Sequence, residues 1–403
     1  MVPEGWEIKK LKSLCKKVID NRGKTPSLSD QGKPLIEINS IIGNKFPDLS
    51  KVTKFVSDET FNTWFRNGHP EKGDVLVATV GNTGVNCIVD FEEGVASIAQ
   101  NLIGLRFVES IDCDFMYYNM NTSNHFSKVK SVVMGAVQPS LKVPHLLSFE
   151  YNIPPLPEQK KIAQILSTWD NAISATERLL ENSQQRKKAL MQQLLTGKKR
   201  LPGFEGEWNV NKLEAVMKRI YGGGTPPRED ISCWNGDLPW VTVKDLVSDR
   251  ITGAQEHISD EGLRNSAANI VEKGNVIIAT RMAVGRVVTC SVDVAINQDL
   301  KAIIPNEKAV PDYIFYWFKY KESEISKLGT GSTVKGIQLS DLKKLTFLTP
   351  PISEQKKIAE ILTTADKEID ALQKRLGHLK QEKKALMQQL LTGKRRVQVD
   401  AAA

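Results

Sequence analysis

The chain has 403 residues, which predicts two or three domains, and a formal net charge of +8 with a pI near 9.0, which favours a nucleic-acid partner without requiring one. No apolar run approaches the ~18 residues that cross a bilayer, and the N-terminal residues do not form a signal peptide, so we expect a cytoplasmic protein. The five cysteines and five histidines are scattered without metal-ligand spacing, which indicates free thiols in a reducing compartment and no metal site.

Residues 1–153 are expected to form the first globular domain. The elements predicted within it are a strand at 35–38, a strand at 75–80 followed by a hairpin loop at 81–84, a strand at 97–107, a helix from Phe115 that ends before Gly135, and a strand or extended segment at 143–153. This order predicts a mixed α/β fold.

A long helix follows at 154–200. Its apolar positions alternate in steps of four and three from Ile162 to Leu194, a heptad pattern that predicts a supercoil against another helix. The pattern also includes Thr176, Ser183 and Lys187, of which only Lys187 is a polar position shared with the second long helix. A helix of roughly 38 residues would be about 57 Å long.

The second half of the chain repeats the first. Residues 201–349 form a second predicted domain in which Trp208 matches Trp6 and a Gly-x-Thr-Pro turn recurs at 223–226 after 23–26. A second long helix at 350–396 precedes a tail at 397–403. About 28 of the 45 paired positions in 154–198 and 350–394 are identical at a constant offset, so the two halves form an internal repeat with pseudo-twofold character. The polar heptad position recurs as Lys383.

The loops of the two domains differ more than their strands, which is typical of two similar scaffolds that recognise unlike targets. No catalytic motif is complete. Gly23-Lys24-Thr25 lacks the leading glycine of a phosphate-binding loop. Asp48 or Asp312 with the Glu-Gln-Lys triplets at 158–160 and 354–356 could suggest a metal nuclease, but the triplets open the long helices, where acidic residues suit the helix dipole. We therefore expect a binding protein without catalytic activity.

The duplicated order, the two Gly-x-Thr-Pro turns and the Pro-Pro pairs followed by Glu158-Gln159 and Glu354-Gln355 resemble the DNA specificity subunit of type I restriction-modification systems. The resemblance covers nearly the whole chain. It implies two target recognition domains of α/β (α+β) fold, each reading one half of a bipartite gapped site in double-stranded DNA. It also implies that the long helices form an antiparallel coiled coil that spaces the domains and docks two modification (methyltransferase) subunits.

In that family, restriction (motor-nuclease) subunits join the complex, and S-adenosylmethionine, ATP and Mg are bound by the partner subunits. The resemblance therefore implies no cofactor in this chain. If both domains face one side of the duplex, half-site centres about 10 base pairs apart are expected.

Candidate DNA-binding residues are polar and basic loop residues beside predicted strands, because side chains at base edges carry specificity and basic side chains hold phosphates. They are Lys24, Thr25, Asn39, Thr79, Asn82, Thr83, Gln100, Gln138 and Lys142 in the first domain, and Thr225, Arg228, Lys244, Arg281, Arg286, Gln298, Lys335 and Gln338 in the second. Arg281 and Arg286 are the strongest candidates. About half of the set is expected to be ordinary solvated loop residues.

Candidate partner-docking residues on the helices are Met191, Gln192, Met387 and Gln388, for which burial within the helix pair is an equal alternative. Glu158, Gln159, Glu354 and Gln355 are expected to cap or dock rather than touch DNA. Two other functions stay open: a coiled-coil protein-interaction scaffold without DNA specificity, and a self-sufficient nuclease.

Overall fold

The computed structural model describes residues 3–23, 25–134, 139–329 and 336–399. The chain divides into two compact units, Met1–Glu177 with Arg375–Ala403, and Arg178–Lys374. Each unit thus contains one globular domain and one half of each long helix. Within the described residues, no helix is both long and apolar enough to cross a membrane.

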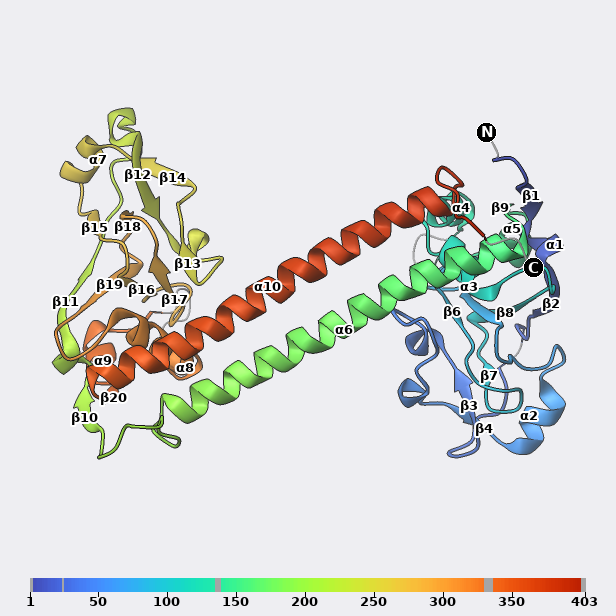
Figure 1. Cartoon of the computed structure of the whole chain (residues 1–403), viewed down its shortest axis with the longest axis horizontal. Coiled ribbons are helices and arrows are strands. Elements are labelled where there is room, and N and C mark those ends of the chain that lie inside the picture. The colour runs from blue at the N-terminus through green and yellow to red at the C-terminus, as the bar shows by residue number, and fades with distance from the viewer. Residues whose placement is uncertain (1–2, 24, 135–138, 330–335, 400–403) are drawn as a thin grey trace. The chain divides into compact units, whose positions relative to one another are not determined.

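The first unit is built on a four-stranded antiparallel sheet in the order β2-β8-β5-β6, with a smaller sheet β4-β3-β7 farther from the long helices (Figure 1). Its strands are β1 (Glu7–Lys10), β2 (Cys15–Ile19), β3 (Lys33–Ile36), β4 (Phe55–Val56), β5 (Val75–Ala78), β6 (Asn86–Ile88), β7 (Ser97–Ile98), β8 (Leu102–Phe107) and β9 (Glu150–Ile153). Its helices are α1 (Leu11–Leu14), α2 (Asp58–Trp64), α3 (Cys113–Met120), α4 (Ser123–Val132) and α5 (Val143–Leu147), with 3-10 turns η1 (Ile38–Ser40) and η2 (Leu49–Lys51).

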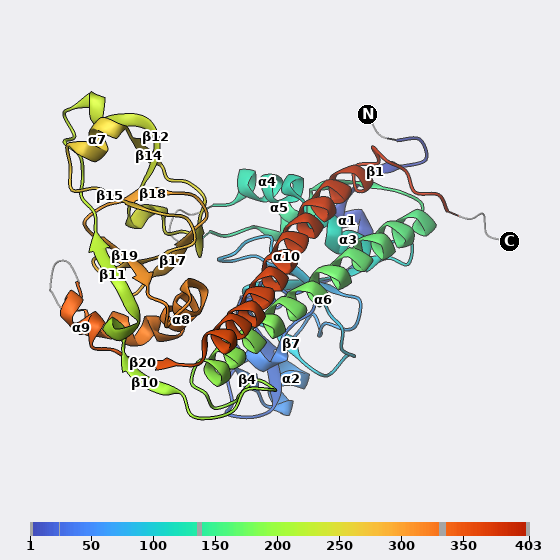
Figure 2. The same cartoon turned by 60° about the vertical axis from the view of Figure 1, so that its left-hand side comes forward.

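The second unit has the same plan with larger sheets (Figure 2). The sheet nearer the long helices has the strand order β11-β19-β16-β17-β13, and the sheet farther from them has the order β14-β12-β18-β15. Its strands are β10 (Asn209–Lys212), β11 (Met217–Gly222), β12 (Trp234–Val241), β13 (Arg250–Ile251), β14 (Glu256–Ile258), β15 (Asn269–Val271), β16 (Val276–Ala279), β17 (Val287–Cys290), β18 (Val294–Ile296), β19 (Leu300–Pro305) and β20 (Thr346–Thr349). Its helices are α7 (Asp260–Arg264), α8 (Pro311–Leu328) and α9 (Leu339–Lys343), with 3-10 turns η3 (Leu213–Val216), η4 (Ile231–Cys233) and η5 (Val243–Asp245).

The mixed α/β fold and the repeat are confirmed, and three predicted elements are corrected. The segment 143–153 begins as helix α5, because Pro144 occupies its first turn and Val143 and Leu146 turn inward, and only then becomes strand β9. The predicted strand 97–107 is interrupted at 99–101. The predicted helix from Phe115 divides into α3 and α4, because Thr122 caps a new helix by accepting from the His125 N–H.

The two long helices are α6 (Leu156–Leu194) and α10 (Ile352–Leu390), of 39 residues each. All heptad positions predicted from Ile162 to Leu194 and from Ile358 to Leu390 are buried or half-buried, whereas Lys188 and Lys384 beside them are exposed. In the first unit the start of α6 contacts the end of α10, and in the second unit the end of α6 contacts the start of α10. The two helices therefore run in opposite directions within each unit.

Candidate nucleic-acid interface and helix junctions

The Gly-x-Thr-Pro turn lies beside the link between two strands in both units. In the first unit, Gln100 Nε2 donates to Thr25 Oγ1 at 2.9 Å. In the second, the Thr225 hydroxyl donates to Gln298 Oε1 at 2.8 Å. The structure therefore brings together predicted residues that lie more than seventy positions apart in sequence. Lys24, from the first turn, lies outside the described residues.

A second group gathers at the hairpin that follows β5 or β16. The Gly81 N–H donates to the Pro139 carbonyl at 2.9 Å, and Arg281 forms a β-bridge with Gly336, so each hairpin lies against the segment before α5 or α9. Exposed Lys142 and Gln338 then occupy the same position, the residue that precedes these helices. Gln138 and Lys335, predicted on the same segments, lie outside the described residues.

The hairpin tips differ between the units. Asn82 is exposed and Thr83 half-buried in the first, whereas Met282 is 66% exposed with φ 61° in the second. Thr79 is fully buried and its hydroxyl donates to the Asn101 carbonyl at 3.3 Å, so this predicted DNA contact is corrected to a structural role. Thr79 is buried because it directly follows the buried strand β5.

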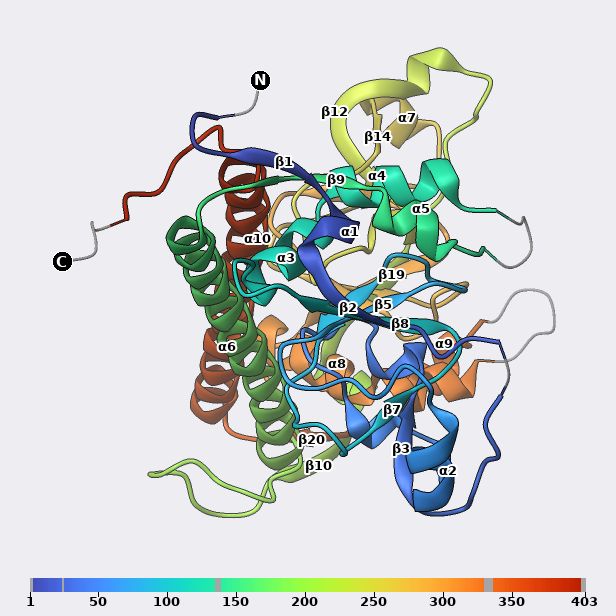
Figure 3. The same cartoon turned by 90° about the vertical axis from the view of Figure 1, so that its right-hand side faces the viewer.

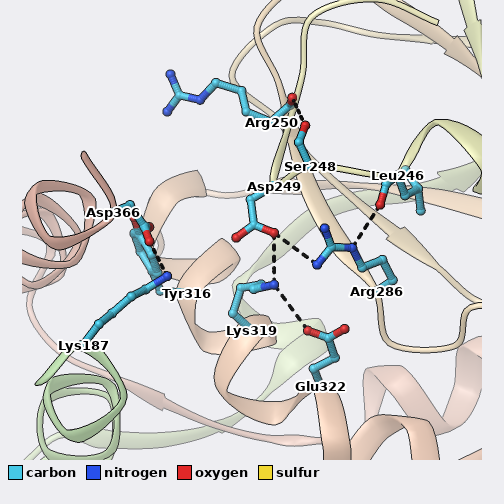
Figure 4. Close-up of polar contacts among 10 residues, drawn as sticks. All are labelled: Lys187, Leu246, Ser248, Asp249, Arg250, Arg286, Tyr316, Lys319, Glu322 and Asp366. Atoms are coloured by element: carbon cyan, nitrogen blue, oxygen red, sulfur yellow. Dashed lines mark hydrogen bonds and ion pairs between the residues drawn. The ribbon is translucent and has the colours of Figure 1, made fainter. Parts of the chain in front are cut away.

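The two favoured arginines have different environments. The Arg281 side chain is 52% exposed and forms an ion pair with Asp299 at 3.6 Å. The Arg286 side chain is 24% exposed, donates to the Leu246 carbonyl at 3.2 Å and pairs with Asp249 at 3.1 Å (Figure 4). Asp249 and the Leu246 carbonyl therefore hold the Arg286 guanidinium, and its contact with DNA stays a prediction.

Other predicted residues lie on exposed turns of the smaller sheets. Asn39 and Lys244 occupy equivalent 3-10 turns and are both exposed. Arg228 is exposed, stacks over Trp234 with 4.1 Å between its guanidinium carbon and the ring centroid, and pairs with Glu256, whose hydrogen bond raises the pKa of Arg228. This stacking holds the guanidinium plane in one orientation before any ligand binds.

One feature of the first unit was missed in the sequence. Asp20, Arg22, Trp64, Arg66 and Asn67 line a cavity of about 540 Å³ beside the first Gly-x-Thr-Pro turn. Arg22 makes two side-chain hydrogen bonds to Asp20, at 2.7 and 2.8 Å, and this hydrogen bonding lowers the pKa of the Asp20 carboxyl. The two aromatic residues followed by a basic one in Trp-Phe-Arg-Asn at 64–67 could have indicated it.

The Glu-Gln pairs dock the long helices onto the domains, as expected. Fully buried Gln355 accepts from the Val310 N–H at 3.0 Å and donates to the Lys308 and Pro350 carbonyls, both at 2.8 Å. Gln159 repeats these contacts with Asp112, Ser110 and Pro154.

The glutamates of these pairs bind an arginine and a tryptophan. Glu354 accepts from Trp208 Nε1 at 3.0 Å and from Arg200 at 2.8 Å. Glu158 does the same with Trp6 and Arg396. Arg396 also donates to the Glu4 carbonyl at 2.7 Å, so the N-terminal segment lies beside the end of α10 (Figure 3).

The polar heptad positions also join domain and helices. Lys187 on α6 pairs with Asp366 on α10, and Asp366 accepts a hydrogen bond from Tyr316 at 2.7 Å (Figure 4). Lys383, Asp170 and Tyr118 repeat the arrangement in the first unit. Burial and then the neighbouring carboxylate raise the pKa of Tyr118, so its hydroxyl stays protonated and donates.

The candidate docking residues are of two kinds. Met191 and Met387 are half-buried against the domain cores, whereas Gln192 and Gln388 are exposed. No group of three or more Asp, Glu, His or Cys side chains in the described part of the chain is placed to hold a metal ion.

Comparison with known proteins gives the class of protein. The family model for the type I restriction modification DNA specificity domain matches the chain twice, at residues 3–182 and 205–381. These matches cover most of the chain, which therefore belongs to the type I restriction-modification DNA specificity family. Its function is recognition of a DNA sequence in such a system, which rules against the scaffold alternative.

Two curated relatives and one solved structure illustrate the likeness. The MjaVIII specificity subunit of Methanocaldococcus jannaschii is 25% identical over 98% of this chain and 94% of its own length. The EcoR124I/EcoR124II specificity subunit of Escherichia coli is 27% identical over 70% of each chain. The S subunit of a type I system from M. genitalium is 14% identical with a TM-score of 0.61, covers 97% of this chain and 96% of its own, and shows the same fold.

Proposed function

We propose that each globular domain reads one half of a bipartite, gapped DNA site. The observation that carries this proposal is that the two units keep the same framework contacts and change the exposed side chains. Asn39 is replaced by Lys244, Lys142 by Gln338, and Asn82 at the hairpin tip by Ala283. Different side chains on equal frameworks would read different base edges.

The two long helices are proposed to space the domains and to dock two modification (methyltransferase) subunits. At 1.5 Å per residue, 39 residues correspond to about 58 Å. In the second unit, Leu190, Ile361 and Ala365 help to line an open groove of about 360 Å³ between α6 and α10, which supports partner docking along this helix pair. Deleting two heptads from one helix should change the gap or abolish assembly, and an unchanged gap would argue against the spacer role.

Catalysis is proposed to belong to the partners. Modification subunits would bind S-adenosylmethionine, and restriction (motor-nuclease) subunits would bind ATP and Mg, in the cytoplasm. The proposal is supported by the family of this chain, whose members are specificity subunits and generally not catalysts.

The test is selection of bound sequences from a random DNA pool by the complex of this chain with its modification subunits. The expected result is one enriched motif with two defined halves and an undefined gap. A single continuous motif, or none, would contradict the two-reader proposal. Cleavage by the chain with Mg alone would instead support a self-sufficient nuclease.

A further inference from the structure

The first unit holds a lysine over an aromatic and acidic site beside α6. Lys45 Nζ lies 2.5 Å from Asp114 Oδ1 on α3, and 5.9 and 5.5 Å from the ring centroids of Tyr117 and Tyr118. An ammonium group is attracted both by the carboxylate and by the faces of the rings. The Lys45 side chain is 21% exposed, so it covers this site.

The second unit has the opposite charge at the equivalent backbone position. The carbonyl of Lys45 accepts from the Ile88 N–H at 2.8 Å, and the carbonyl of Asp249 accepts from the Thr289 N–H at 3.0 Å. Ile88 and Thr289 are equivalent, because they pair with the first residues of β5 and β16. Lysine in one unit therefore corresponds to aspartate in the other.

Asp249 does not fill the site. Its carboxylate turns toward Lys319 at 3.0 Å and Arg286 at 3.1 Å (Figure 4). In the second unit, Asp312, Phe315 and Tyr316 occupy the positions of Asp114, Tyr117 and Tyr118, the residues that surround Lys45 in the first unit. They line an open cavity of about 600 Å³. The same binding elements are thus present without the lysine.

The charges around this cavity favour a cation. Asp366 is paired with Lys187 and Asp249 with Lys319, whereas Asp312 and Asp370 make no ion pair with any residue in the described part of the chain. Arg286, Arg250 and Lys367 also line the cavity. Arg286 is paired with Asp249, and Arg250 and Lys367 are exposed to solvent, as Asp312 and Asp370 are. The lining thus carries four carboxylates and three cationic groups, a balance that favours a cation over an anionic phosphate.

We infer that this cavity receives a lysine side chain of a modification subunit, in the place that Lys45 fills in the first unit. The inference rests on the proposed docking of those subunits on the helices, because α10 supplies one wall through Asp366, Asp370 and Gln373. The occupant is a lysine because the equivalent site holds one. The two units consequently bind their partners unequally, since only the second needs the partner's lysine.

The first test is titration of the full chain with its modification subunit, followed by native mass spectrometry. The double variant Asp312→Asn, Asp370→Asn is expected to bind one of the two subunits about 10-fold more weakly, because the inserted lysine loses both of its carboxylate partners. The other subunit binds unchanged. Both residues are exposed, so folding should be preserved. The matched control, Asp114→Asn, removes only the internal partner of Lys45 and should leave both affinities as in the wild type.

The second test is cross-linking of the wild-type complex with a carbodiimide, which joins a carboxylate to an amine at contact distance. The expected product links Asp312 or Asp370 to a lysine of the modification subunit and disappears in the double variant. Unchanged affinity in the double variant, or cross-links only to Lys367 of this chain, would overturn the inference. A wild-type chain that binds no modification subunit would instead refute the proposed function itself.

Discussion

Lys187 and Asp366 form an ion pair between the two long helices, with side chains that are 14% and 28% exposed. Tyr316 from the domain donates to the same carboxylate at 2.7 Å, and the Lys187 ammonium lies 5.8 Å from its ring centroid. Lys187 therefore connects α6 to α10 and, through Asp366, to Tyr316 on α8. Polar residues at such positions are known to specify register at a cost in stability.

Replacing Lys187 by methionine should destabilise the second unit by about 1–3 kcal/mol, because Asp366 then stays half-buried without its cation. Adding Asp366→Leu should recover part of the loss. Urea unfolding measures both effects. Lys188→Met, at the exposed neighbouring position, is the control, and equal behaviour of the two lysine variants would refute the register role.

Replacing Glu354 by glutamine should lower the melting temperature of the second unit. The variant keeps the size of the side chain but leaves the Arg200 guanidinium without a carboxylate, at a site where Glu354 is fully buried. Thermal unfolding measures the change. Glu360→Gln, on the exposed face of α10, should have little effect, and a small loss for Glu354→Gln would mean that Arg200 is stabilised mainly by water.

Arg281 and Arg286 should behave differently when each is changed to alanine. Arg281→Ala should cost about 1–3 kcal/mol of DNA binding and relax one base of the second half-site, because its exposed guanidinium can reach a base edge. Arg286→Ala should lower the melting temperature and leave the motif intact, since it removes a partner of Asp249. Selection from random DNA with each variant complex measures the recognised motif, and thermal unfolding measures the melting temperature. The reverse pattern would exchange the two roles.

His125 should make the first unit sensitive to acid. Burial lowers its pKa from 6.5 to about 4, and its Nδ1 lies 2.7 Å from the Tyr151 hydroxyl. Between these two values the unfolded chain binds more protons than the folded one, so stability falls as the pH falls from 6.5 to 4, by up to about 3 kcal/mol.

The measurement is the free energy of unfolding against pH for the wild type and for His125→Gln. The variant should lose this part of the slope, whereas His378→Gln, at an exposed position on α10, should keep it. Identical slopes for wild type and His125→Gln would show that other groups cause the acid sensitivity.

The long helices could be predicted closely, because a heptad pattern repeated at a constant offset depends only on local periodicity. The buried strands β5 and β16 were found because each is a continuous apolar run that follows a glycine turn. The segment 143–153 was wrong in its first half, because its short apolar run does not distinguish a buried helix turn from a strand. Tertiary packing decided that case.

The candidate interface was predicted less well. The pairing of Thr25 with Gln100 follows from residues that were chosen in sequence, yet their contact depends on sheet pairing. The burial of Thr79 and the ion pair of Arg286 with Asp249 depend on neighbours that are distant in sequence. The ion pairs of Lys187 and Lys383 could not be predicted either, because their partners Asp366 and Asp170 are distant in sequence. Their charge at otherwise apolar heptad positions did distinguish the two lysines in the sequence.

The most direct measurement is to replace residues 1–153 by the corresponding domain of another specificity subunit and to map the methylated DNA positions in cells that carry the hybrid complex. We predict that one half of the recognised sequence changes, while the other half and the gap stay the same. A change in both halves, or in neither, would contradict the claim that each domain reads its own half-site.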